Sequence, residues 1–444
     1  METADWKFLI FEVKSRIKQM TKKTRTILFV LLVILFLVLA PLITFYSWGY
    51  RFDWESKKIT ATGAFYFKVL PKSSQIYLNG KLAKKTDFFF GSAYLENLLP
   101  KKYQIKIQKD GFHPWEKSLE IKEREITRLE NIVLFTQSPN FTFLTKNVLD
   151  FFVSPDQKKI VLKEIDGKNW SLKLFEPGQN IKSQLIKDKD IAKTEVDLIS
   201  LEFSPDSKEI SLKVIVGEET IEYSLNLEKT PPILVKKKNM TIPDNVLTYQ
   251  ADNNGNIYYL DNQGYVFKAD QSFLPLAKIN DAPFKAKQET EYKINVLPDN
   301  LLLLQETKTP YLFNPAAKSF EKFSDSIKGL KVSPDNKKFA YFSDSEIWVY
   351  FLKDQTGQPL KKAGEKIFLS RFSEKINELF WLNDNYLVFN TGDKIKIAET
   401  DDRDKINTVD LTDFPGPKIY WSNISKKLFI LSDNSFYSSS NLLP

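Results

Sequence analysis

The sequence SPDNKKFAYFS, at residues 333–343, decides the fold because two near-copies of it occur far upstream. They are SPDQKKIVLKE, which begins at Ser154, and SPDSKEISLKV, which begins at Ser204. In each copy Ser-Pro-Asp favours a type I turn, since proline presets φ and the hydroxyl and carboxylate accept backbone hydrogen bonds. The apolar residues that follow alternate with others, as in a half-buried strand. A turn that leads into a strand and recurs in this way predicts a repeat architecture.

Weaker versions of this turn recur through the C-terminal part of the chain. Aligning the turn aspartate gives seven positions: Asp156, Asp206, Asn253, Asp299, Asp335, Asp384 and Ile424. Their mean separation is about 45 residues, which is the length of a four-stranded propeller blade. Residues 136–444 therefore predict a β-propeller of about seven blades, with six and eight as alternatives. We expect a strand near residues 140–147 to complete the last blade, because a ring must join its two ends.

The repeats resemble those of TolB-like propellers, whose blades carry SPDGK-type turns, because no Trp-Asp pair closes the later strands as in true WD repeats. We interpret the aspartates as turn formers. The stretch DNNGN, at residues 252–256, suggests a calcium loop but lacks the later bidentate Glu, so a hairpin is favoured. The acidic stretch ETDDRDK, at residues 399–405, is interpreted as a charged turn rather than a carboxylate pair for acid–base catalysis.

Residues 27–46, ILFVLLVILFLVLAPLITFY, predict a transmembrane helix because they contain no charged side chain. Twenty residues at about 1.5 Å each span the roughly 30 Å of a bilayer core. Four basic residues precede the segment: Lys18, Lys22, Lys23 and Arg25. By the positive-inside rule they hold the N-terminus in the cytoplasm. With no cysteine for lipid attachment, the helix itself is the expected anchor of a single-pass membrane protein whose bulk is extracytoplasmic.

A cleaved signal peptide is the rival interpretation, since VLA at residues 38–40 suits a signal peptidase. Pro41 directly after the cut and the continuing apolar run argue against it. The flanking segments are predicted to be a basic cytoplasmic N-terminus, residues 1–26, and a juxtamembrane linker, residues 47–61. An amphipathic helix on the inner leaflet and a solvated basic lead-in both remain open for the N-terminal segment.

Residues 62–135 predict a small β-sandwich. Asn79-Gly80 joins two short apolar runs, and both residues accept the positive φ of a type I′ hairpin turn. The stretch YQIKIQKDGF, from Tyr103, alternates apolar and polar residues and ends in another turn. A further alternating stretch completes the domain.

The order of four features in this segment resembles the PEGA domain: Pro71, IYLNGK at residues 76–81, LLPKKYQIKIQKDGF at residues 98–112, and Trp115. The four residues that give that family its name are replaced here by Pro-Lys-Ser-Ser. The resemblance implies an extracytoplasmic, non-enzymatic module near a membrane anchor, which binds cell-surface material or proteins, and it favours a bacterial envelope. The lysine excess of the segment either meets anionic polymers and headgroups or is a solvated face that protects sheet edges.

Composition excludes several classes of function. The 444 residues include no cysteine and a single histidine, His113, which removes thiolate metal sites and Ser-His triads. We expect no cofactor, no metal and no catalytic residue, and we interpret His113 as a surface turn residue. The net charge is +8, but the propeller segment is slightly acidic, which argues against nucleic-acid binding.

Two classes of function remain. The first is a binding or scaffold protein that presents the small domain and the propeller to envelope proteins or cell-surface glycans. The second is a propeller-based enzyme acting on glycans or small substrates. Such enzyme sites need converging histidine, arginine and carboxylate side chains, yet residues 134–444 contain no histidine and only Arg371 and Arg403. The sequence therefore favours a protein that is not an enzyme.

Overall fold

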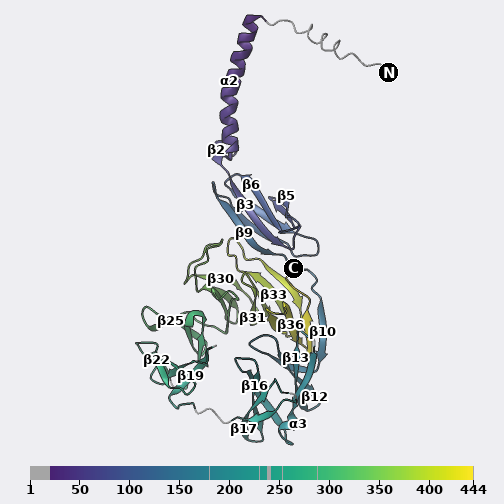
Figure 1. Cartoon of the computed structure of the whole chain (residues 1–444), viewed down its shortest axis with the longest axis vertical. Helices are drawn as coiled ribbons and strands as arrows, with labels where there is room; N and C mark the ends of the chain where they lie inside the picture. The colour runs from purple at the N-terminus through teal and green to yellow at the C-terminus, as the bar shows by residue number, and fades with distance from the viewer. Residues whose placement is uncertain are drawn as a thin grey trace, which may run out of the picture.

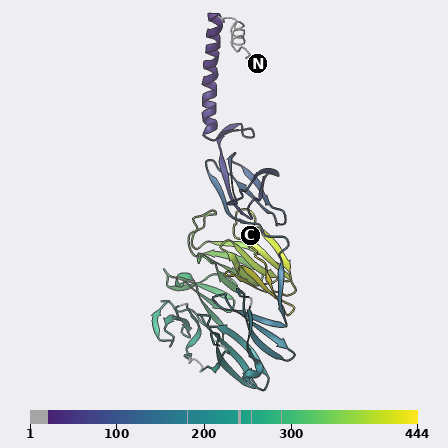
Figure 2. The same cartoon turned by 45° about the vertical axis from the view of Figure 1, so that its right-hand side comes forward.

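The computed structural model describes residues 21–179, 181–229, 231–237, 242–252, 254–287 and 289–443. A long helix, a small two-sheet domain and a seven-bladed propeller follow one another along the chain and along the long axis of the molecule (Figures 1 and 2). The predicted class, all-β apart from one N-terminal helix, is confirmed. Residues 1–20, which hold most of the predicted basic N-terminus, and the aligned repeat position Asn253 lie outside the described residues.

Helix α2 (Lys22–Ser47) contains the predicted apolar span and begins five residues before it. Thr21 caps its N-terminus through a hydrogen bond from the Thr24 N–H. No side chain of the helix is buried, and its mean hydropathy is 3.2. Among the described residues it is the one helix long and apolar enough to cross a membrane.

The segment expected to be a linker instead forms a two-stranded hairpin, β1 (Tyr50–Asp53) and β2 (Lys58–Ala61). The contacts of Arg51 hold this hairpin in place. Its guanidinium lies 3.6 Å from the centre of the Tyr46 ring and donates hydrogen bonds to the Tyr46 carbonyl and to Asn97 Oδ1. The hairpin thus connects the end of the helix to the small domain.

The small domain is a sandwich of two sheets with the strand orders β6-β3-β9 and β5-β4-β7-β8. Its strands are β3 (Gly63–Leu70), β4 (Gln75–Leu78), β5 (Lys81–Lys85), β6 (Ser92–Leu98), β7 (Lys102–Gln108), β8 (Trp115–Glu120) and β9 (Ile126–Val133). Asn79 and Gly80 both have positive φ, as a type I′ turn requires. The alternating residues of β7 and β8 fill the shared core.

Each propeller blade is a four-stranded antiparallel sheet. Blade one contains β11 (Val148–Val153), β12 (Ile160–Asp166), β13 (Asn169–Glu176) and β14 (Ile181–Lys187). Blade two contains β15 (Val196–Phe203), β16 (Glu209–Val216), β17 (Glu219–Asn226) and β18 (Leu234–Lys236), after the short helix α3 (Asp188–Ile191). Blade three contains β19 (Val246–Ala251), β20 (Ile257–Asp261), β21 (Val266–Ala269) and β22 (Pro275–Lys278).

The remaining blades follow the same plan. Blade four contains β23 (Tyr292–Val296), the 3₁₀ turn η1 (Pro298–Asn300), β24 (Leu302–Glu306), β25 (Thr309–Asn314) and β26 (Ser319–Lys322). Blade five contains β27 (Gly329–Val332), β28 (Lys338–Phe342), β29 (Glu346–Phe351) and β30 (Lys366–Arg371). Blade six contains β31 (Ile376–Asn383), β32 (Tyr386–Thr391), β33 (Lys394–Glu399) and β34 (Thr408–Asp413). Blade seven contains β35 (Lys418–Ser422), β36 (Lys427–Ser432), β37 (Ser435–Ser439) and, from the other end of the propeller sequence, β10 (Phe141–Lys146).

Strand β10 confirms the expected closure, since it pairs with β37 and completes the last blade. Buried apolar clusters join neighbouring blades around the ring, with one exception. They join blade seven to blade one, blade one to blade two, and each pair of neighbours from blade three to blade seven. Blades two and three share no buried apolar cluster within the described residues, and blade three has a cluster of its own. The ring is therefore packed continuously from blade three through blade seven to blade two.

The repeated Ser-Pro-Asp turns have one conserved set of hydrogen bonds in blades one, two and five. In blade five, Asp335 Oδ1 accepts from Ser333 Oγ at 2.5 Å and from the Lys337 N–H at 3.1 Å. The residue after the aspartate has positive φ in all three copies: Gln157, Ser207 and Asn336. The turns also connect blades, because the backbone N–H of Asp335 donates to Asp384 Oδ1, at 3.0 Å, in blade six. In blades one and five the turn therefore also joins the blade to its neighbour.

Candidate functional site

The sequence named no catalytic, cofactor or metal residue, and the structure gathers ionisable side chains in two places. One is the junction between the small domain and the propeller, and the other is the propeller axis. In the part of the chain that is described, no group of three or more His, Asp or Glu side chains is arranged to hold a metal ion.

Lys117 is the centre of the junction. Strand β8 alternates between core and surface, and Lys117 occupies a core-facing position between Trp115 and Leu119. Its ammonium lies 2.9 Å from Glu399 Oε1. It also donates hydrogen bonds of 2.6–2.9 Å to three backbone carbonyls of the propeller loop that follows β33: those of Asp401, Arg403 and Lys405. The Lys117 side chain is completely buried.

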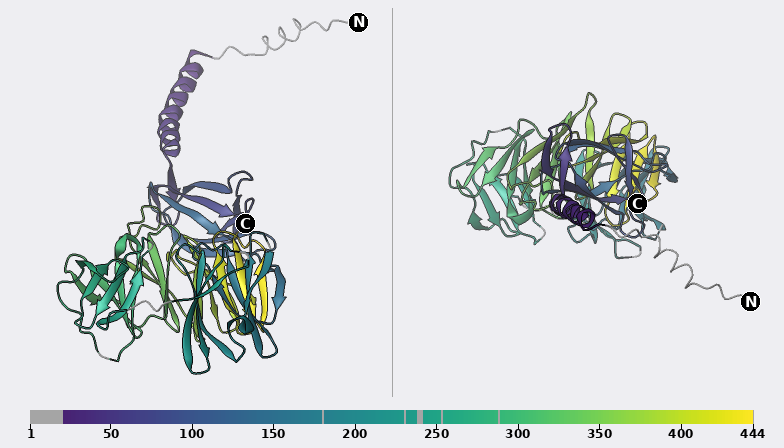
Figure 3. Two further views of the ribbon diagram at one scale, coloured as in Figure 1. Left: turned by 60° about the horizontal axis from the view of Figure 1, so that its bottom comes forward. Right: turned by 90° about the horizontal axis from the view of Figure 1, so that it is seen from above.

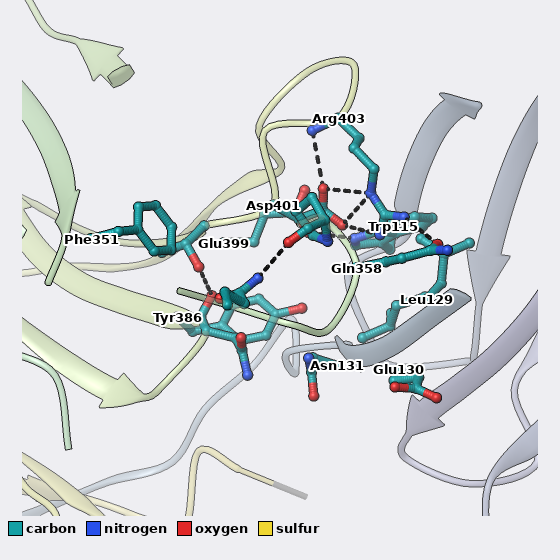
Figure 4. Close-up of a pocket in the computed structure, with 15 residues that line it drawn as sticks. Trp115, Leu129, Glu130, Asn131, Phe351, Gln358, Tyr386, Glu399, Asp401 and Arg403 are labelled. Carbon is teal, nitrogen blue, oxygen red and sulfur yellow. Dashed lines mark hydrogen bonds and ion pairs between the residues drawn. The ribbon is translucent and has the colours of Figure 1, made fainter. Parts of the chain in front are cut away.

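Further hydrogen bonds surround this centre, as Figure 4 shows in part. Trp115 Nε1 donates to Glu399 Oε2 at 2.8 Å, and the Ser118 N–H donates to Asp404 Oδ2 at 2.7 Å. The buried hydroxyl of Tyr386 accepts from the Val133 N–H at 2.9 Å. The cavity between these groups measures only about 40 Å³, which is enough for a few water molecules. The junction therefore holds two domains together and leaves no room for a substrate.

The junction carboxylates have opposite pKa shifts. Burial raises the pKa of Glu399, and the charge of Lys117 opposes the rise. Burial by itself would raise the pKa of Asp401 as well, but the hydrogen bonds from Arg403 and the charge of Lys117 lower it. The segment 399–405 is thus a charged loop, as expected, and it also binds the small domain.

The junction lies on the face of the ring that carries the Ser-Pro-Asp turns. Its propeller residues come from the β29–β30 loop, the start of β32 and the β33–β34 loop, and all of these leave the sheets on that face. Seen from above, the small domain covers the yellow-green blades and leaves the green blades at the left uncovered (Figure 3). Helix and propeller are thus on opposite sides of the small domain.

The axis carries five ionisable side chains, which we call the axial belt. They come from the first strands of five consecutive blades: Lys293, Lys331, Glu378, Lys418 and Asp150. Contacts between first strands of neighbouring blades join β19 to β23, β27 to β31, β31 to β35 and β11 to β15, which makes the first strands the innermost ones of the ring. The Ile419 N–H of blade seven donates to Glu378 of blade six, and Lys418 of blade seven forms an ion pair with Asp150 of blade one. These contacts join three consecutive blades at their first strands.

Glu378 is the unusual acid of the axial belt. Burial raises its pKa to about 7, although the Ile419 N–H and the charges of Lys418 and Lys331 oppose the rise. The ammonium of Lys418 forms its ion pair with Asp150 instead. Glu378 therefore exchanges a proton near neutral pH, which is the property required of a general acid or base.

Lys331 is the unusual base. Burial lowers its pKa, Glu378 opposes this effect, and Lys293 adds to it. The side chain is nevertheless reached by water, and its Nζ lies 4.7 Å from the centre of the Phe380 ring. Lys331 is thus an exposed lysine whose ammonium lies over an aromatic ring of the next blade.

The sequence contained a signal for Lys117 that the sequence analysis did not use. Lys117 alternates with the apolar residues Trp115 and Leu119, and this alternation places it on the buried face of its strand. The two arginines of the propeller are not at the axis: Arg371 pairs with Glu346, and Arg403 lies at the junction. His113 differs from the expected surface residue, since its Nε2 is buried without a hydrogen-bond partner in the described structure.

A third feature is a loop tip between β5 and β6. Phe88, Phe89 and Phe90 are each about three-quarters exposed (73–74%). Asp87 fixes this loop, because its carboxylate accepts hydrogen bonds from the N–H groups of Phe89 and Phe90 and from Ser92. We call these three phenylalanines the Phe tip.

Comparison with known proteins found similar solved structures only, all at low sequence identity. No family model matches the sequence, and no curated protein sequence matches it significantly. Among solved structures, the β-propeller domain of Cps50 (Swd1) from Myceliophteria thermophila is similar, with 11% identity, a TM-score of 0.43, and coverage of 68% of this chain and 99% of that one.

Two further structures are similar at the same level. YCF48 from Cyanidioschyzon merolae has 9% identity and a TM-score of 0.42, covering 67% of this chain and 98% of its own. Virginiamycin B lyase from Staphylococcus aureus has 11% identity and a TM-score of 0.42, covering 68% and 99%. At these values the similarity carries no information about function.

Proposed function

We propose that this chain is a single-pass membrane protein that binds a partner outside the cytoplasm. Helix α2 is the anchor, and the basic residues before it keep the N-terminus in the cytoplasm. The exposed aromatic residues Tyr46, Trp48 and Trp54, at the far end of the helix and in the hairpin, suit the outer membrane interface. The small domain and the propeller then lie in the extracytoplasmic space.

The Phe tip is the observation that carries the binding function. Exposed aromatic clusters of this kind are costly in water and are typical of interaction sites. The hydrogen bonds to Asp87 fix the loop before any partner arrives, so little conformational entropy is lost on binding. The chemistry favours a protein with an apolar pocket over a glycan as the partner of this loop.

The junction supports the same function. With Lys117 buried against the propeller, the tip and the ring move as one rigid body, and a partner held at the tip meets the propeller face in a fixed orientation. We assign the small domain to PEGA-like modules and the ring to TolB-like propellers of a bacterial cell envelope. The chain acts as a scaffold for envelope proteins or surface glycans, with no enzymatic activity, no cofactor and no nucleic-acid partner.

The test is site-specific photo-crosslinking in membranes that contain the full chain. A photoreactive phenylalanine analogue at Phe89 is expected to give a discrete adduct with one envelope protein. The control is the same analogue at Phe368, which is also exposed but lies in the propeller. Equal and diffuse labelling at both positions would show that the tip is not a binding site.

An envelope enzyme is the second candidate, and Glu378 is the observation that favours it. A carboxyl group that titrates near pH 7 at a propeller axis suits proton transfer to a glycan or another small substrate. The assay is release of new reducing ends from envelope glycans by the full chain, compared with the Glu378→Gln variant. Activity that survives this substitution, or no activity in either protein, counts against the enzyme.

A further inference from the structure

A groove runs between blades four and five toward the outer strands of the ring. It consists of two adjoining cavities of about 620 and 410 Å³, and Lys322, Phe323 and Lys366 line both of them. The larger cavity lies at the β28–β29 turn, on the face of the ring opposite the Ser-Pro-Asp turns and the small domain. Cavities of this size are typical of sites for small ligands.

Aromatic side chains line the larger cavity. Tyr341 and Trp348 are cross-strand neighbours in β28 and β29, with ring planes 12° apart and ring centres separated by 6.4 Å. Phe323, directly after β26, packs against Tyr341 with the ring centres 5.1 Å apart. Trp348 Nε1 donates to Glu346 Oε2 at 3.0 Å. These contacts fix the indole ring before any ligand arrives, which lowers the entropy cost of binding.

Hydroxyl groups line the same cavity beside the aromatic rings. Ser324, Ser326 and Ser345 are half-buried residues of its lining. Within the described residues their hydroxyls make no hydrogen bond. Each hydroxyl can donate one hydrogen bond and accept two, so the three serines are available to a polar ligand.

The charges that line the larger cavity balance one another. Lys322 forms an ion pair of 2.7 Å with Asp325. Lys366 donates to the Phe323 carbonyl, and its ammonium lies 3.7 Å from the centre of the Phe323 ring. Glu346 is the second acid of the lining. With two lysines against two acids and both lysines engaged by the protein, the cavity favours an uncharged ligand over an anion.

We propose that this groove binds a neutral oligosaccharide. The C–H faces of a sugar ring are apolar and its edge carries hydroxyls, so such a ring matches aromatic side chains that lie beside free serine hydroxyls. Tyr350 lines the second cavity and is two residues from Trp348, on the same face of β29 and about 7 Å away. The groove therefore suits an extended chain of sugars better than a single sugar. The site is separate from the Phe tip, so either can fail without the other.

The test is isothermal titration calorimetry of the full chain in a detergent without a sugar headgroup, with cellotetraose and chitotetraose as separate probes. We expect saturable binding of at least one probe. Ser326→Tyr, which fills the larger cavity, and Trp348→Leu, which removes the stacking surface, should each weaken it at least tenfold. Ser183→Tyr is the matched control, because it places the same ring at an exposed position of blade one and should leave the affinity unchanged.

Thermal unfolding of each variant separates lost binding from lost folding. Ser326→Tyr changes a half-buried position of a loop and is expected to unfold at the temperature of the wild type, so it decides the outcome if Trp348→Leu is destabilised. Without saturable binding of either probe to the wild type, or with affinity unchanged in both groove variants, the proposal is overturned. Binding of random decapeptides that Ser326→Tyr abolishes, with no binding of either sugar, would overturn it in favour of a peptide site.

Discussion

Lys117 of the small domain and Glu399 of the propeller lie 2.9 Å apart, and both side chains are almost completely buried. Removing two charges from water is costly, and here the cost is offset because three carbonyls and Trp115 supply further hydrogen bonds. The pair therefore fixes how the two domains meet, since any other docking would lose this ion pair and the hydrogen bonds around it.

Lys117→Met is expected to destabilise the protein by about 3–5 kcal/mol, because it leaves Glu399 buried without its cation. Chemical denaturation of the full chain in detergent measures this change. Lys405→Met is the matched control, since Lys405 forms an exposed ion pair of 3.8 Å with Glu116 at the edge of the same junction. We expect a loss below about 1 kcal/mol there. Equal losses in both variants would contradict the central role of Lys117.

Asp335→Ala is expected to lower the free energy of unfolding by about 1 kcal/mol, roughly the loss of one capping hydrogen bond. Burial alone would raise the pKa of Asp335, but the hydrogen bonds from Ser333 and Lys337 and the charge of Lys338 lower it. The same substitution at Asp206 serves as control, because that turn has the same local hydrogen bonds but is exposed. Its loss should be smaller, and partner binding should survive in both variants.

Glu378→Gln is expected to stabilise the protein at pH 8 and to leave it unchanged at pH 4.5 or below. The folded pKa of about 7 is above the ordinary value of 4.5. Charging Glu378 therefore opposes folding increasingly as the pH rises from 4.5 to 7, and the full penalty remains above pH 7. We expect a gain of about 1–2 kcal/mol at pH 8 after allowance for partial exposure. Denaturation curves at both pH values measure it.

Glu202→Gln is the control for this pH dependence, because Glu202 is an exposed acid on the first strand of blade two. Its substitution should change stability little at either pH. A stabilisation by Glu378→Gln that is equal at pH 4.5 and pH 8 would show that the raised pKa is not its cause.

Phe436→Ala is expected to cost about 3–5 kcal/mol, as for other fully buried phenylalanines. Phe436 lies in β37, beside the closing strand β10, and its ring contacts Phe429 and, in blade one, Phe151. Phe143→Ala, in β10 itself, removes a ring that is about half exposed and should cost much less. If the two losses measured by thermal unfolding are similar, the closure of the ring does not depend on this core.

Much of the architecture could be predicted because its signals are local. The Ser-Pro-Asp turn and the alternation of apolar residues after it lie within about ten residues. The spacing of these turns predicted the length of a blade and a count of about seven blades. The apolar run of α2 and the Asn79-Gly80 hairpin are equally local. The hairpin within the juxtamembrane segment was not predicted, because it depends on the tertiary contacts of Arg51 with Tyr46 and Asn97.

The functional residues depended on tertiary structure. Trp115 and Glu399 are 284 positions apart, and no local pattern shows that their strands meet. The sequence by itself determined the class of fold, because turn chemistry and period act along the chain. Only the folded ring decided that Lys117 pairs with Glu399 and that burial raises the pKa of Glu378 to about 7, because charge and burial depend on which surfaces come together.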